Sequence, residues 1–66
     1  MTAKVFGMRL KAMRIKRELS QDALAKKVGV TREYIARLEG GHHDPPLSTI
    51  EKLAKALGVK VSALVD

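Results

Sequence analysis

The side chains best suited to specific recognition lie together in the middle of the chain. Thr31-Arg32-Glu33-Tyr34 is followed by Arg37, one helical turn beyond Glu33. An Arg guanidinium donates two parallel hydrogen bonds to guanine, and a Glu carboxylate accepts one from the cytosine amino group. Arg32, Glu33 and Arg37 therefore carry groups that can form specific, directional hydrogen bonds with a partner. A plainer alternative is that Glu33 and Arg37 only form an exposed ion pair, because they stand four residues apart on one helix.

Two short helices are expected to hold these side chains. Ser20 is a suitable N-cap for a helix over Gln21 to Val28, and Gly29 ends that helix because glycine readily takes a positive φ. Thr31 caps a second helix, Arg32 to Glu39, which stops at a pair of glycines. Both helices are too short to be stable alone, so packing must hold them in place.

The connection between these two helices is a tight corner. Two helices joined by a short turn that contains Gly are typical of a helix-turn-helix, here over about residues 21–39. Such a corner needs small residues where the backbones meet, and Ala25 and Gly29 meet that need. Ile35 and Leu38 are expected to fill the space beneath the second helix.

Three further helices are expected around this corner. One runs from about Lys4 to Glu18, another begins at a capping box of Ser48 and Glu51, and a last turn covers about Val61 to Val65. Their apolar residues recur at helical spacing: Phe6, Leu10 and Met13; Ile50, Leu53, Ala54 and Leu57; Val61 and Leu64. No useful stretch alternates with period two. The predicted fold is all-α, a compact five-helix bundle forming a single domain over residues 1–66.

The segments "LSQDALAKKVGVTREYIARLEGG" and "PLSTIEKLAKALGV" resemble the phage repressor and Cro type of helix-turn-helix domain. This family is also called the xenobiotic-response-element family of bacterial regulators. The resemblance extends from about Leu10 to Val65 and implies a lambda-repressor-like five-helix bundle. It also implies binding of operator DNA, usually as a two-fold dimer. Residues 32–39 would be the recognition helix that enters the major groove.

The resemblance assigns roles within this unit. It places base reading on Arg32, Glu33 and Arg37. It implies that Gln21 contacts a phosphate, which agrees with the attraction of a helix N-terminus for an anion. Contacts to the DNA backbone are expected from Gln21, Thr31, Tyr34, His42 and His43. For Thr31, capping alone is the plainer role, and for Gln21 an ordinary exposed helix position.

The loop after the recognition helix departs from the family pattern. Related proteins often carry basic residues where this chain has His42-His43-Asp44. Phosphate contact here would depend on the histidines, which donate more strongly when protonated. These three residues also suggest a metal site, but adjacent residues chelate poorly without further ligands. No metal and no cofactor is therefore expected.

Arg14 and Glu39 have a different expected role. Many family members pair an Arg in the first helix with a Glu that ends the third, and both residue types stand at the matching positions here. The resemblance implies a structural ion pair that holds the first helix against the recognition helix. Arg14 is therefore not counted as a DNA contact.

Composition narrows the class of partner. The chain has 13 Lys and Arg against seven Asp and Glu, a net charge of +6, and its first 17 residues contain no acid. A basic field indicates a polyanion, with nucleic acid first and an anionic membrane second, unless it serves solubility alone. Aromatic residues are too few for a platform that stacks single strands. A membrane role is disfavoured because the apolar stripe of the first helix is expected to face the core.

Other classes are excluded by what the sequence lacks. There is no Cys, no apolar run of transmembrane length and no signal-peptide pattern, which predicts a soluble, cytoplasmic protein. No constellation of catalytic or metal-binding residues is present, and the core is too small to enclose a substrate pocket, so no enzyme is expected.

Two functions remain. The first is a sequence-specific regulator of transcription that binds double-stranded DNA, acting as a repressor or autoregulator. The second is a helix-turn-helix module for protein contacts, such as an antitoxin or bridging cofactor. The polar recognition face favours DNA. Because one short helix reads few base pairs, a homodimer on an inverted repeat is expected, joined through the C-terminal turn with Val59, Lys60 and Val65.

Overall fold

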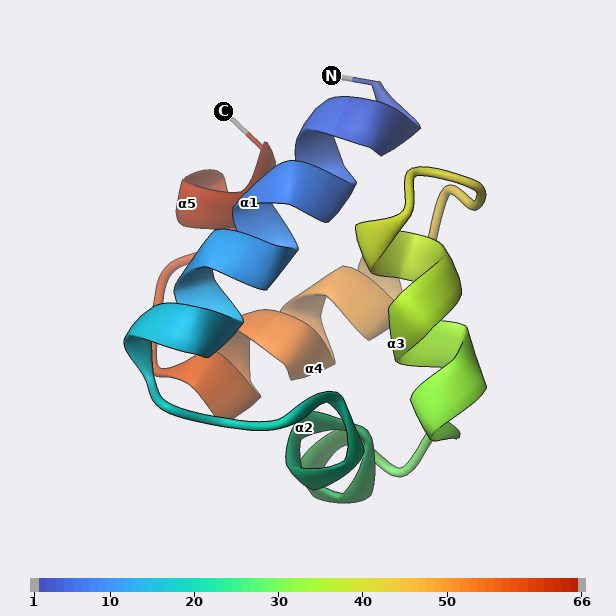
Figure 1. Ribbon diagram of the computed structural model, residues 1–66. Coiled ribbons are helices and arrows are strands. Elements are labelled where there is room, and N and C mark those ends of the chain that lie inside the picture. Colours follow the sequence, from blue (N-terminus) through green and yellow to red (C-terminus); the bar gives the residue numbers. More distant parts are fainter. Residues whose placement is uncertain (1, 66) are drawn as a thin grey trace.

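The computed structural model describes residues 2–65, and within this range the chain forms five helices and no strand. They are α1 (Ala3–Lys16), α2 (Gln21–Val28), α3 (Arg32–Glu39), α4 (Leu47–Leu57) and α5 (Ser62–Val65). In Figure 1, α1 runs diagonally from the N-terminus and α4 lies below it, α2 and α3 form the lower and right-hand sides, and α5 lies beside α1. The predicted all-α five-helix bundle is confirmed.

One apolar core joins all five helices. Its largest side chains are completely buried, including the only phenylalanine of the chain. Burial of each large aliphatic or aromatic side chain contributes roughly 1.5–3 kcal/mol to folding. The buried apolar residues are Phe6, Leu10, Leu24, Ala25, Ile35, Leu38, Ile50, Leu53, Ala54, Leu57 and Leu64. The expected inward stripes therefore face the core, while Met13 and Val61 are partly buried at its edge.

The ends of α2 and α3 follow from local signals in the sequence. The hydroxyl of Ser20 accepts a hydrogen bond from the Ala23 N–H at 2.9 Å, and that of Thr31 accepts from the Tyr34 N–H at 3.1 Å. Gly29 ends α2 at φ 82°, in the left-handed region that favours glycine. The bounds predicted for both helices are confirmed.

The start of α4 differs from the prediction. The helix begins at Leu47, its N-cap is Pro46, and no side chain caps it. The Pro46 carbonyl already accepts hydrogen bonds from the Thr49 and Ile50 N–H groups, at 3.0 and 3.1 Å. Ser48 therefore lies within the first turn, and the predicted capping box is wrong. The proline ring fixes a φ of −67° that suits entry into a helix, and the helix begins two residues earlier than it would with Ser48 as the cap.

The end of α1 also comes earlier than predicted, at Lys16 instead of Glu18. Glu18 has a φ of 56°, which a helix cannot contain. The chain turns here so that Leu19 and Ser20 can lead into α2, and the Leu19 N–H still bonds to the Arg14 carbonyl at 3.2 Å.

Two glycines bring α1 close to the end of α3. A Cβ atom on Gly7 would lie 2.3 Å from the carbonyl oxygen of Leu38 and 2.8 Å from that of Glu39. A Cβ on Gly41, which has a φ of 76°, would lie 2.9 Å from the Cα of Lys4. No larger residue fits between these backbones without a shift. The first two turns of α1 therefore fix where α3 ends.

Candidate nucleic-acid interface

Helix α3 has a buried side and an exposed side. Ile35 and Leu38 are completely buried, whereas Arg32, Glu33 and Arg37 are exposed. Arg32 Nη2 lies 3.5 Å from Glu33 Oε2, with 53% and 69% of the two side chains exposed. The alternative in which Glu33 pairs with Arg37 is wrong, because Glu33 pairs with its neighbour Arg32 and Arg37 turns toward Tyr34.

Tyr34 connects α3 with the following loop. The Arg37 guanidinium carbon lies 6.0 Å from the centroid of the Tyr34 ring. On the same ring, His43 packs edge-on with centroids 5.5 Å apart and an interplanar angle of 68°. The sequence predicts only the contact between Tyr34 and Arg37, since these residues are three positions apart on a helix. The histidine contact depends on how the loop folds back, which the sequence does not reveal.

Glu39 accepts hydrogen bonds from two other helices. Arg14 in α1 donates from Nε to Glu39 Oε2 at 2.6 Å and from Nη2 to Oε1 at 3.1 Å. Its Nη1 donates to the Leu19 carbonyl at 2.7 Å. Only 11% of the Arg14 side chain and 4% of the Glu39 side chain are exposed. The hydrogen bond to Glu39 raises the pKa of Arg14. Burial lowers this pKa by a smaller amount, and the attraction of the Glu39 charge raises it further. The guanidinium is therefore charged.

Gln21 belongs to the same network. Its Nε2 donates to Glu39 Oε1 at 3.1 Å. The first residue of α2 is thus tied to the last residue of α3, a contact that the sequence reasoning missed. A side-chain amide has two N–H donors, so one hydrogen remains for another acceptor after the bond to Glu39.

The loop between α3 and α4 exposes both of its histidines. The backbone N–H of His42 donates to the Arg37 carbonyl at 3.1 Å and so continues the end of α3. Within residues 2–65, no three His, Cys, Asp or Glu side chains gather closely enough to hold a metal ion. The structure places His43 beside the exposed side of α3 through its contact with Tyr34.

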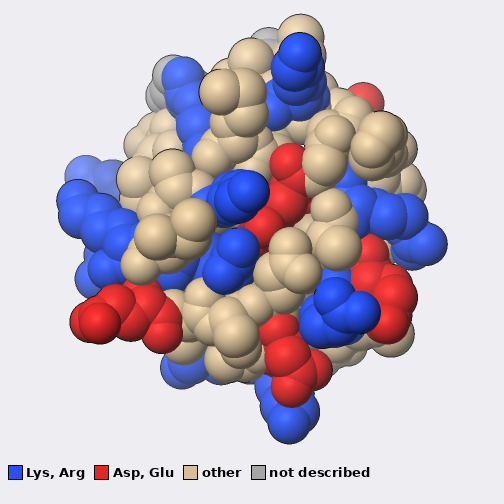
Figure 2. All heavy atoms as spheres, in the orientation of Figure 1, with Lys and Arg blue, Asp and Glu red and all other residues tan. Residues whose placement is uncertain are grey.

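The surface around these elements is strongly basic. Figure 2 shows more Lys and Arg than Asp and Glu atoms on the face that carries α1. No acid stands anywhere in α1, whereas Lys4, Arg9, Lys11, Arg14 and Lys16 do. Such a field attracts polyanions over several ångströms and is weakened by salt. None of the helices within residues 2–65 has the length and apolar character needed to cross a membrane.

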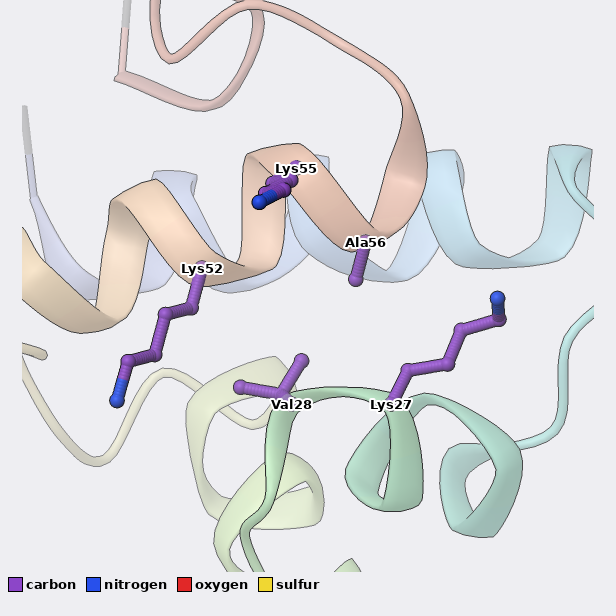
Figure 3. Close-up of a pocket in the computed structure, with 5 residues that line it drawn as sticks. All are labelled: Lys27, Val28, Lys52, Lys55 and Ala56. Atoms are coloured by element: carbon purple, nitrogen blue, oxygen red, sulfur yellow. The ribbon is translucent and has the colours of Figure 1, made fainter.

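A hollow of about 490 Å³ lies between α2 and α4, lined by Lys27, Val28, Lys52, Lys55 and Ala56. In Figure 3 the ammonium groups of Lys27 and Lys52 point in different directions and do not converge on one point. The volume is that of a small-molecule site, but such sites hold convergent polar groups. The three lysines of this hollow add positive charge to this side of the surface.

Comparison with known proteins agrees with this geometry. Residues 10–64 match the family described as helix-turn-helix. The immunity repressor of Bacillus phage phi105 is 48% identical over 59 residues, which cover 89% of this chain. The chain spans only 41% of the length of that repressor.

Two solved structures have the same fold over nearly the whole chain. The restriction-modification controller protein C.AhdI from Aeromonas hydrophila superposes with a TM-score of 0.91 at 37% identity and covers 94% of each chain. SinR, a master regulator for biofilm formation solved in complex with DNA, gives a TM-score of 0.88 at 32% identity, covering 92% of this chain and 98% of that one. The chain belongs to the helix-turn-helix family of phage repressor and Cro-type transcriptional regulators.

Proposed function

We propose that the protein is a sequence-specific regulator of transcription that inserts α3 into the major groove of double-stranded DNA. The observation that carries this proposal is the division of α3 into a completely buried side and a charged, exposed side on a helix held by Glu39. SinR, with the same fold, is bound to DNA in its own structure. A repressor or autoregulator in the cytoplasm fits the immunity repressor and the controller protein among its relatives.

Base reading is assigned to Arg32, Glu33 and Arg37. The Arg32–Glu33 ion pair is exposed, and exposed pairs contribute only about 0–1 kcal/mol. The pair would therefore open at little cost when a guanine or cytosine edge offers a better partner. A good bidentate contact to the correct base contributes roughly 1–3 kcal/mol of discrimination against the wrong base. The Arg37 guanidinium lies over the Tyr34 ring, and this contact limits the directions in which Arg37 can approach the DNA.

Contacts to the DNA backbone are assigned to Gln21, Thr31, Tyr34, His42 and His43. Gln21 stands at the N-terminus of α2, where the helix attracts an anion, and its second amide hydrogen is available for a phosphate. A phosphate bound there would be connected through Glu39 to the end of α3. The backbone contact would thereby set the position of the reading helix.

We further propose a homodimer that binds an inverted repeat through the C-terminal turn. Val59, Val61 and Val65 are only partly buried around α5, so apolar surface remains there for a second copy. A dimer doubles the number of bases read and places two α3 helices about 34–36 Å apart, one turn of DNA.

The alternative function is a module for protein contacts, such as an antitoxin or bridging cofactor. It would need an apolar recognition face. The large exposed apolar residues among those described are Val5, Met8, Ile15 and Leu47, and none belongs to α3. The exposed face of α3 therefore favours DNA, and a binding role is proposed instead of a catalytic one.

In-vitro selection of duplexes from a random pool tests the proposal directly. We expect enrichment of an inverted repeat, and affinity for it should fall steeply between 50 and 200 mM salt, by about 10³-fold or more if six or more phosphates are contacted. Arg32→Ala should relax the base preference at one position in each half-site, whereas Gln21→Ala should weaken all duplexes about equally.

The proposal fails if no sequence is enriched or if affinity hardly changes with salt. An equal loss for all duplexes with Arg32→Ala would instead remove Arg32 from the reading set. Lys55→Ala, on the hollow between α2 and α4, is the matched control for loss of one positive charge away from α3.

A further inference from the structure

The outer side of α1 carries a second apolar stripe. Exposed fractions are 39% for Val5, 62% for Met8 and 56% for Ile15, and Ala12 is also exposed. These residues follow one another at spacings of three, four and three, so they share one side of the helix. That side is opposite Phe6 and Leu10, which are completely buried. The stripe is therefore not part of the core.

Clustering distinguishes this stripe from ordinary surface residues. Single exposed apolar side chains are normal on soluble proteins, whereas a contiguous patch marks an interaction site. Of the large apolar side chains that are exposed among residues 2–65, all but Leu47 belong to this stripe. It extends over about 15 Å, the rise of ten helical residues. The sequence reasoning assigned only one apolar stripe to this helix and missed the second.

Basic side chains border the stripe on both edges. At 100° per residue, Lys4 and Lys11 lie along one edge and Arg9 and Lys16 along the other. No ion pair joins these four residues to any acid within residues 2–65. In Figure 2, blue side chains border uncharged surface along α1. An occupant that covers the stripe meets positive charge on both sides.

We propose that this outer face of α1 docks an amphipathic helix of a protein partner, with acidic residues on both sides of its apolar stripe. The match is one of charge and of length. Apolar residues at i, i+3, i+7 and i+10 of a partner helix would cover the same length of about three turns. Ala12 in the middle of the stripe allows close approach of a second helix. No residue of the stripe is among the proposed DNA contacts, so docking and DNA binding use different surfaces.

The charge pattern argues against two other occupants. A second copy of α1 would place two rows of Lys and Arg against each other, because α1 contains no acid. An anionic membrane would attract the basic edges, but the helices that bind its surface insert Trp, Phe or Leu, and the stripe contains none of these.

Binding of two designed helical peptides to the isotopically labelled protein tests this inference. One peptide carries a Leu stripe between two rows of Glu, and the other has Lys in place of every Glu. We expect the Glu peptide to bind at least tenfold more tightly and to shift the NMR signals of Val5, Met8, Ala12 and Ile15. The double variant Met8→Gln with Ile15→Gln should abolish saturable binding, while DNA affinity and helicity remain unchanged.

Two further variants keep the test decisive. Leu47→Gln removes an equally exposed apolar side chain, 63% exposed, and should leave peptide binding unchanged. Lys11→Glu with Lys16→Glu keeps the apolar stripe but leaves one positive and one negative charge on each edge, so the preference for the Glu peptide should be lost. The inference is overturned if the shifts map to another surface or if both peptides bind equally. It is also overturned if the stripe mediates self-association, or binds phosphatidylserine vesicles while the Glu peptide does not bind.

Discussion

At the scale of single residues, the Glu39 carboxylate stands at the junction of three helices. It ends α3, and it accepts two hydrogen bonds from Arg14 in α1 and one from Gln21 in α2. Only 4% of its side chain is exposed. A buried charge is stable when several donors surround it and costly when it or its partner is left alone. Glu39 therefore holds the end of α3 against α1 and α2.

Glu39→Ala should destabilise the protein by about 3–5 kcal/mol, because the mostly buried Arg14 guanidinium loses its partner. Urea unfolding followed by circular dichroism measures this loss. An arginine stays charged at neutral and mildly alkaline pH even without a partner, so the unpaired Arg14 charge that this prediction requires is present in the variant. For a chain this short, such a loss is most of the total stability.

Two controls make the Glu39 prediction specific. Lys26→Ala removes the exposed Asp22–Lys26 pair, with 58% and 80% of the side chains exposed, and should cost only about 0.3–0.5 kcal/mol. Arg14→Met combined with Glu39→Met removes both charges and should recover most of the stability. If Glu39→Ala costs no more than Lys26→Ala, the proposed role of this ion pair is wrong.

At the scale of helices, the sequence predicted best those helix ends that are set by neighbouring residues. Ser20, Gly29 and Thr31 form their caps with near neighbours, so the bounds of α2 and α3 were predicted correctly. The start of α4 was missed because a proline took the capping position ahead of Ser48. The contact of His43 with Tyr34 was missed because it joins a loop to a helix, and no spacing rule describes it.

The role of Gly7 also depends on a contact between segments far apart along the chain, so the sequence alone did not predict it. In the sequence it looks like a weak residue within a helix, since glycine lowers helix stability by roughly 1 kcal/mol relative to alanine. In the structure it is the point where α1 meets the backbone of Leu38 and Glu39. A glycine is needed at this position because the backbone of Leu38 and Glu39 comes so close, and these two residues are more than 30 positions away along the chain.

Gly7→Ala should therefore destabilise the protein by about 1–3 kcal/mol, although alanine is the better helix former, because its Cβ would lie 2.3 Å from a backbone oxygen. The shift between α1 and α3 should also weaken binding to the selected duplex. Thermal unfolding and a binding titration measure the two effects. Met8→Ala, at an exposed neighbouring position, should change neither. A Gly7→Ala protein that is more stable than the parent would contradict this packing argument.

At the scale of the whole molecule, the proposed functions use separate surfaces. The net charge of +6 favours a polyanion as partner, and the side chains proposed to distinguish sequences all belong to α3. Three of the four large exposed apolar residues among residues 2–65 lie on the α1 stripe, and partly buried valines surround the C-terminal turn. Charge, periodicity and resemblance predicted the DNA face from the sequence. The α1 stripe appeared only when the structure showed which of two apolar sides faces the core.

The C-terminal turn carries the last prediction. If Val65 lies between two copies in the proposed dimer, then Val65→Asp places two carboxylates in an apolar contact, which costs several kcal/mol unless they are separated. Sedimentation should then show a monomer at concentrations where the parent is a dimer. Affinity for the inverted repeat should fall at least tenfold, while affinity for a single half-site stays the same. Leu47→Asp, the matched change at an exposed residue of α4, should leave both unchanged. A dimer that survives Val65→Asp would move the interface to another surface, whereas loss of half-site binding as well would show that Val65 supports the fold.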